Sequence, residues 1–240
     1  MLSVVRSRTV CLGFLLAALI VSIPAQFGGV ALAGTVDIFS GPSNGSNSVT
    51  GTNTGVAVSP SWAVPSGPGY EWISYGDTGC NTYVALTGRC TPGPENPMGT
   101  TVTSSPTAIF YQTFVITDAL DSGILNVWAD DTAGVWLDSG TVTSGTGTGG
   151  TELWAPNGNL GSNCANAPIG CISGMDAVIP LSLTTGTYTL VVDAYQLVGG
   201  SPFGVMYDAA LTNTPEPASY LLLGLGLAGL GLLIRRRKLA

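Results

Sequence analysis

The stretch F-Y-Q-T-F-V-I, residues 110–116, places Phe, Gln, Phe and Ile on one face of an extended chain and Tyr, Thr and Val on the other. A two-residue period of this kind is the pattern of a β-strand, because successive side chains of a strand point to opposite faces of the sheet. Residues 110–116 therefore predict a strand with one face in a core.

Similar apolar runs follow along the chain. Residues 124–129 and 135–137 flank the sequence D-D-T-A-G, residues 130–134, and predict two strands that this turn joins as a hairpin. Later strands are predicted at residues 177–183, 188–195 and 203–211. Strands separated by Gly-rich and Thr-rich turns, with no helical period between them, predict an all-β antiparallel sandwich.

The first 33 residues have the three parts of a secretory signal peptide. Arg6 and Arg8 precede an apolar run at residues 10–23, and Ala-Leu-Ala stands directly before Gly34. A basic start, an apolar run and small residues at the cleavage site are what signal peptidase requires. We therefore expect residues 1–33 to form a signal helix that is removed, so that the mature protein begins at Gly34.

The C-terminal residues 214–240 combine Pro-Glu-Pro, the uncharged residues 218–234, and a run of three Arg and one Lys. The seventeen uncharged residues would form a helix of about 25 Å, at the short end of what crosses a hydrocarbon core of about 30 Å. Cations next to a membrane helix stay on the cytoplasmic side. Residues 34–213 are therefore expected to form an exported ectodomain.

This tail resembles the PEP-CTERM sorting signal of Gram-negative bacteria, with Pro215, Glu216 and Pro217 as the motif. The resemblance implies recognition by an exosortase, which removes the tail, in bacteria that also make exopolysaccharide. The residues expected to retain the transmembrane helix are Arg235, Arg236, Arg237 and Lys238. The protein would thus be anchored transiently in the inner membrane and then reach the cell surface or the extracellular space. An ordinary single-pass anchor that carries two prolines is the alternative.

Charge and composition exclude several classes of function. Residues 34–213 hold thirteen of the fourteen acidic residues and a single base, Arg89, which gives a net charge of −12. Nucleic acid and anionic lipid are therefore poor partners. The chain has no histidine, which excludes Ser-His-Asp and Cys-His nucleophiles and every metal site that contains histidine. We expect neither a metal nor a cofactor.

Four cysteines lie in the predicted ectodomain: Cys80, Cys90, Cys164 and Cys171. In an oxidising compartment they favour disulfides over metal thiolates, and neither of the two close pairs has the C-x-x-C spacing of a zinc or redox site. Three pairings are open, of which pairing of nearest neighbours is the simplest. We expect no free thiol in the mature protein.

Asp130, Asp131 and Asp138 form the densest acidic group of the chain. Turn formation is the favoured interpretation, because Asp side chains hydrogen-bond to the backbone of tight turns. The second is a Ca²⁺ site, although the sequence departs from the loop pattern D-x-[DN]-x-[DN]-G. The third is glycoside hydrolysis, which needs two carboxyl groups held about 5 to 9 Å apart across a cleft.

Aromatic side chains concentrate in residues 62–75, a segment punctuated by Pro and Gly. The favoured interpretation is that they close one end of the sandwich core. Alternatively, exposed indole rings could stack on sugar rings. The candidates for such platforms are Trp62, Trp72, Trp128, Trp136 and Trp154.

The block N-V-W-A-D-D-T-A-G-V-W-L-D, residues 126–138, and the two last predicted strands are similar to galactose-binding-like jelly rolls. The similarity implies a jelly-roll sandwich whose relatives often bind sugars, but it transfers no sugar site, because that family binds through variable loops. We expect a non-enzymatic surface or matrix protein that contacts exopolysaccharide. The alternatives are a carbohydrate-binding module and a glycoside hydrolase that uses paired acids.

Overall fold

The computed structural model describes residues 35–67, 69–84, 89–92, 99–117, 122–142, 149–158, 169–199, 202–212, 224–229 and 235. The chain divides into two compact units. One comprises residues 34–214 and the other residues 1–33 together with 215–240.

All thirteen strands of the described residues lie in the unit of residues 34–214. They are β1 (Thr35–Phe39), β2 (Ser46–Asn47), β3 (Thr54–Gly55), β4 (Ile73–Ser74), β5 (Cys80–Val84), β6 (Arg89–Pro92), β7 (Ala108–Ile116), β8 (Ser122–Asp130), β9 (Thr132–Ser139), β10 (Thr151–Trp154), β11 (Ala177–Leu181), β12 (Gly186–Tyr195) and β13 (Gly204–Thr212).

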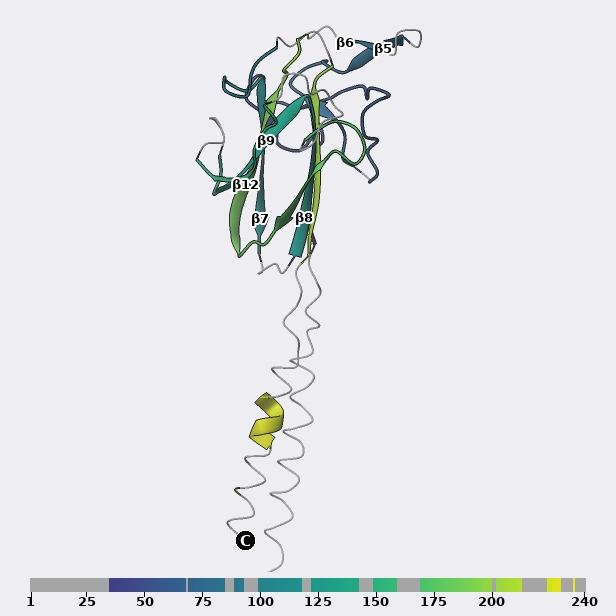
Figure 1. Ribbon diagram of the computed structural model, residues 1–240. Helices are drawn as coiled ribbons and strands as arrows, with labels where there is room; N and C mark the ends of the chain where they lie inside the picture. The colour runs from purple at the N-terminus through teal and green to yellow at the C-terminus, as the bar shows by residue number, and fades with distance from the viewer. Residues whose placement is uncertain are drawn as a thin grey trace, which may run out of the picture. The chain divides into compact units, whose positions relative to one another are not determined.

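The strands form two antiparallel sheets and a separate hairpin. The first, here called the β8 sheet, has the order β11-β8-β13-β4-β3, and β1 also pairs with β13. The second, the β12 sheet, has the order β10-β9-β12-β7-β2. Figure 1 shows β7, β9 and β12 of the second sheet beside β8 of the first, with the hairpin β5–β6 beyond their ends.

The core lies between these two sheets, where the strands bury alternate side chains. Leu125 and Val127 of β8 and Leu190 and Val192 of β12 belong to one buried cluster, which draws residues from both sheets. In β7, Val115 faces outward and is 56% exposed. The predicted all-β antiparallel sandwich is confirmed, because both inner faces carry the apolar half of a two-residue period.

The predicted hairpin at residues 130–134 is wrong. β8 ends at Asp130 and β9 begins at Thr132, but β8 pairs with β11 and β13 whereas β9 pairs with β10 and β12. At this crossing the Asp131 N–H donates to the Tyr195 carbonyl oxygen at the end of β12, 3.2 Å away. The chain is thereby attached to the opposite sheet, so it crosses between the layers instead of turning back along β8 (Figure 1).

The long strands alternate between the sheets along the chain. β7 lies in the β12 sheet, β8 in the β8 sheet, β9 and β10 in the β12 sheet, β11 in the β8 sheet, β12 in the β12 sheet and β13 in the β8 sheet. Only β9 and β10 are consecutive long strands of the same sheet and also pair with each other. Most consecutive long strands of the described residues therefore belong to different sheets.

In the other unit, the described residues 224–229 are helical, and so is Arg235. Within the described part of the chain, no helix is long and apolar enough to cross a membrane. The predicted signal helix, residues 1–33, and most of the predicted span, residues 218–234, lie outside the described residues.

Candidate functional site

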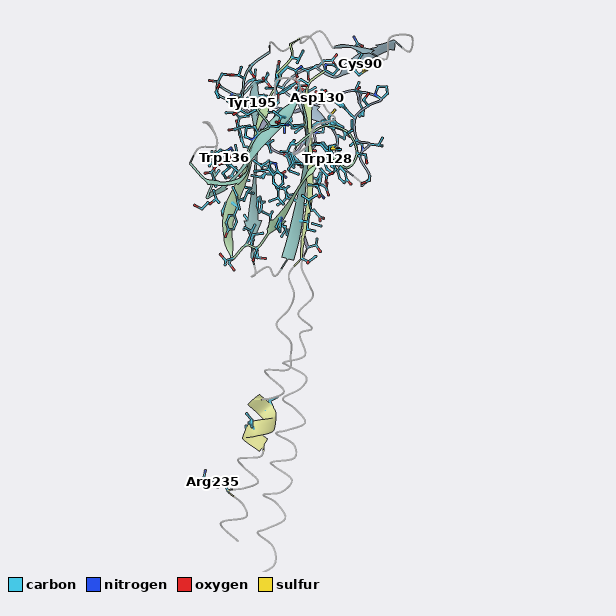
Figure 2. All side chains as sticks on the ribbon, in the orientation of Figure 1. Cys90, Trp128, Asp130, Trp136, Tyr195 and Arg235 are labelled. Atoms are coloured by element: carbon cyan, nitrogen blue, oxygen red, sulfur yellow. A yellow bond between two sulfur atoms is a disulfide. The ribbon has the colours of Figure 1, made fainter. Side chains whose placement is uncertain are left out.

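Two carboxyl groups lie at the crossing from β8 to β9. Asp130 and Asp131 are 5% and 4% exposed, and their side chains hydrogen-bond to each other. The Trp62 indole N–H donates to Asp130 Oδ2 over 2.7 Å. Figure 2 shows Asp130 at the end of the sandwich that also carries Cys90. The acidic pair is therefore part of the packed end of the domain.

The two acids have different environments. Burial raises the pKa of Asp130 well above its ordinary range, and the neighbouring Asp131 carboxylate raises it further, outweighing the lowering by the Trp62 hydrogen bond. Asp131 instead accepts the backbone N–H groups of Leu197 and Val198 at 2.8 and 3.0 Å. The site therefore favours the protonated form of Asp130. The pair ties the crossing to Trp62 and to the segment after β12.

Asp138 is not part of this pair. It lies near the far end of β9, opposite Thr189 of β12, and is buried. A Cβ atom at Gly150 would lie 2.5 Å from Asp138 Oδ1, so the segment at residues 149–150 passes directly over the carboxyl group. Asp138 is a strand residue, which corrects the prediction of a turn there. Among the described residues, no three side chains of metal-binding type gather into a cluster.

Two of the predicted aromatic platforms are core residues. Trp62 and Trp72 are 3% and 0% exposed, and their ring centroids lie 4.3 Å apart. Together with Met206 and Cys171 they form a second buried cluster. Both rings are thus buried, but in a cluster separate from the main core, so the favoured interpretation that they close one end of that core is not confirmed. A buried indole cannot stack on a sugar.

The other three tryptophans are half-buried. Trp128 on β8 and Trp136 on β9 lie on opposite outer sides of the sandwich, as Figure 2 shows. A Cβ atom at Gly134 would lie 3.3 Å from both the Trp136 indole nitrogen and a Pro156 carbon, so the chain after β10 packs close to this ring. Trp154 packs against the main core. None of the three presents a fully exposed ring.

One disulfide joins Cys80 of β5 to Cys90 of β6, with a Cα–Cα distance of 5.2 Å. Cys171 is disulfide-bonded as well, and Cys164, its predicted partner, lies outside the described residues. The pairing of nearest neighbours is thus observed for the first two cysteines. This bridge closes the hairpin that stands apart from both sheets.

A groove on the outer face of the β8 sheet was not predicted from the sequence. It has a volume of about 640 Å³ and is lined by Gly123, Ile124, Asn126, Pro180, Leu181, Ser182, Asp208, Ala210 and Thr212. Asn126 and Asp208 face each other across β8 and β13, and the Asn126 amide donates to Asp208 Oδ2 over 3.4 Å. The only sign of this groove in the sequence is that β8 and β13 each carry a polar residue, Asn126 and Asp208, at an outward-facing position.

The groove combines an acidic group with exposed apolar surface. Burial raises the pKa of Asp208, the Asn126 hydrogen bond lowers it, and the nearby Asp176 carboxylate raises it. Ile124, on the same face, is 53% exposed. The groove can therefore offer a hydrogen-bonded carboxyl group next to an aliphatic surface.

The predicted sorting residues of the tail lie outside the described residues, except Arg235, which is exposed. Residues 213–238 match the PEP-CTERM protein-sorting motif. No curated protein matches the chain. This motif implies an exported protein that is anchored transiently in the membrane and processed by an exosortase.

Proposed function

We propose that this chain is a non-catalytic surface or extracellular-matrix protein whose sandwich is delivered by its C-terminal tail and associates with exopolysaccharide. The observation that carries the proposal is the sorting motif at residues 213–238. On this view the tail is a transient anchor in the inner membrane of a Gram-negative bacterium. The exosortase acts after signal peptidase has removed residues 1–33, and the sandwich is the functional product.

The strand order supports a jelly roll as the fold of the delivered domain. The long strands of the β8 sheet are ordered β1-β13-β8-β11, and those of the β12 sheet β7-β12-β9-β10. Eight strands in two sheets, with most connections crossing between the sheets, are the arrangement of a double Greek key. Jelly rolls serve unrelated functions, so the fold supports a binding or scaffold role without naming the ligand.

The surroundings of the acidic residues support a non-catalytic role. Glycoside hydrolysis needs two carboxyl groups that face substrate across a cleft. Asp130 and Asp131 instead point at each other and at buried N–H donors, and Asp138 lies under the segment at residues 149–150. The hydrolase alternative therefore has no observation in its favour, whereas the groove of the β8 sheet favours carbohydrate binding as a second candidate function.

The test is the change Glu216→Ala in a host that carries the exosortase. We expect uncleaved protein to accumulate in the inner membrane, because the motif loses its only charged group while the uncharged run and the basic cluster are unchanged. The matched control is Glu152→Ala, which removes an exposed carboxylate from edge strand β10 of the folded domain. Fractionation and mass spectrometry of the mature C-terminus report the outcome. Normal trimming and surface delivery of the Glu216 variant would contradict the proposal.

A further inference from the structure

We propose that the groove on the outer face of the β8 sheet binds a polysaccharide that carries free amino groups, a polymer of the glucosamine type. This inference rests on the proposed delivery of the domain to a polysaccharide-bearing surface and names the ligand class. Eight of the nine lining residues, all but Ser182, lie in β8, β11 or β13, whose backbone is fixed in the sheet, so most of the site exists before a ligand arrives.

Charge selects a cationic ligand. Asp208 lines the groove, Asp176 lies close enough to act on it electrostatically, and Asp37 stands on the neighbouring strand β1 opposite Ala210. None of the lining residues is a base, and Arg89, the single base of residues 34–213, is on strand β6 of the separate hairpin. An anionic polymer would meet uncompensated like charge here, whereas an ammonium group would gain a partner in Asp208.

The remaining polar groups suit hydroxyls. The Asn126 amide and the side chains of Ser182 and Thr212 can each both donate and accept a hydrogen bond. Ile124, Pro180 and Ala210 lie among them and offer aliphatic contact to the C–H groups of a sugar ring. A peptide ammonium group needs acceptors alone, so the mixture of donors, acceptors and aliphatic surface favours a sugar.

The edge of the sheet disfavours an added peptide strand. β11 is an edge strand of the β8 sheet, and it contains Pro180, which has no N–H group to donate. An extended peptide that paired with this edge would therefore lack a hydrogen bond. The groove instead lies over the outward side chains, where recognition of a chain of rings requires no strand pairing.

The dimensions fit a short segment of polymer. Along β13 the lining runs from Asp208 to Thr212, four residue steps and therefore about 13 Å. The volume of about 640 Å³ lies within the range of about 300 to 1,000 Å³ that is typical of small-ligand sites. The site would thus hold a few consecutive sugars of a longer chain.

The experiment is calorimetric titration of the ectodomain, which forms a compact unit with its own core. The probe is a fully deacetylated glucosamine tetrasaccharide, compared with its N-acetylated counterpart, with a hyaluronan oligosaccharide and with tetralysine. The test variants are Asp208→Asn, which can keep the Asn126 hydrogen bond, and Ile124→Ser. The controls lie on the β12 sheet: Glu152→Gln is the control for Asp208→Asn, and Val115→Ser is the control for Ile124→Ser. Val115 matches Ile124 in exposure, since their side chains are 56% and 53% exposed.

We expect saturable binding of the glucosamine probe, with a loss of affinity of at least tenfold in Asp208→Asn, a smaller loss in Ile124→Ser, and none in the controls. Weaker binding of the N-acetylated sugar and no binding of hyaluronan would support the proposal. Absence of saturable binding, equal effects in test and control variants, equal affinity for the N-acetylated sugar, or tighter binding of tetralysine would each overturn it. Because this titration does not involve the tail, its failure is distinguishable from failure of the processing experiment.

Discussion

Replacing Asp130 by Asn should change how the stability of the ectodomain depends on pH. The folded state raises the pKa of Asp130 above its ordinary value of 3.8, so the folded protein holds this proton more tightly than the unfolded chain does. The stabilisation from Asp130 is therefore fully present below its ordinary pKa of 3.8 and is lost as the pH rises through the raised, folded-state pKa. An Asn side chain does not titrate, so the stability of the Asp130→Asn variant lacks this dependence on pH.

The geometry sets the expected magnitudes. The Asn oxygen can accept the Trp62 N–H that Asp130 Oδ2 now accepts over 2.7 Å, and the Asn amide can donate to Asp131 in place of the acid proton. Asp130→Asn should therefore cost little at acid pH and should be at least as stable as the wild type at neutral pH. Asp130→Ala leaves the buried Trp62 N–H without its acceptor and should cost about 1–3 kcal/mol.

Urea unfolding of the ectodomain from pH 4 to pH 9, followed by tryptophan fluorescence and circular dichroism, measures these differences. Glu152→Gln is the control for loss of an exposed carboxylate. We expect the free energy of unfolding of Asp130→Asn to rise relative to that of the wild type as the pH increases. Parallel pH profiles for the two proteins, or an Asn variant as unstable as the Ala variant, would refute the reasoning that folding raises the pKa of Asp130.

Two further predictions concern export and the disulfides. Replacing Arg235, Arg236, Arg237 and Lys238 together by Ser should let the tail slide through the membrane or insert in the wrong orientation, because each cation costs about 2.5–3.5 kcal/mol at the membrane centre. Protease protection in spheroplasts measures the orientation of the tail. An unchanged orientation would argue against retention by charge. Edman sequencing of the mature protein should begin at Gly34, and thiol labelling without reductant should detect no free cysteine. Replacing Cys80 and Cys90 together by Ser should lower stability by about 2–3 kcal/mol, which urea unfolding of the variant and the wild type without reductant measures.

Local patterns in the sequence predicted individual strands correctly. The two-residue period of residues 110–116 reappears as β7, and the predicted strand at residues 188–195 lies within β12. The burial of the aromatic segment follows from its polarity, since Trp72 has no exposed surface, but its place in a cluster apart from the main core does not. Both features, the strands and the burial of the aromatics, could be predicted because they depend on the periodicity and polarity of residues that are neighbours in the sequence.

The predicted hairpin at residues 130–134 is wrong because a turn-like composition does not distinguish a chain reversal within one sheet from a crossing between two sheets. The difference was made by contacts with distant residues: Asp131 bonds to the backbone near the end of β12, and Trp62 bonds to Asp130. Asp138 was grouped with these acids by its position in the sequence. Strand β9 separates them by seven residue steps, about 23 Å in an extended strand.

The sequence by itself determined that the domain is built of antiparallel strands and that the C-terminal residues of the chain carry a sorting signal. Both features depend on residues that follow one another in the chain: the two-residue period of the strands and the composition of the tail. The tertiary structure alone decided which sheet each strand joins, which acids are buried and where the groove lies. Asn126 and Asp208 are 82 residues apart in the chain, and they meet only because β8 and β13 pair in one particular register. That register results from the packing of the whole inner face, which no local stretch of sequence specifies.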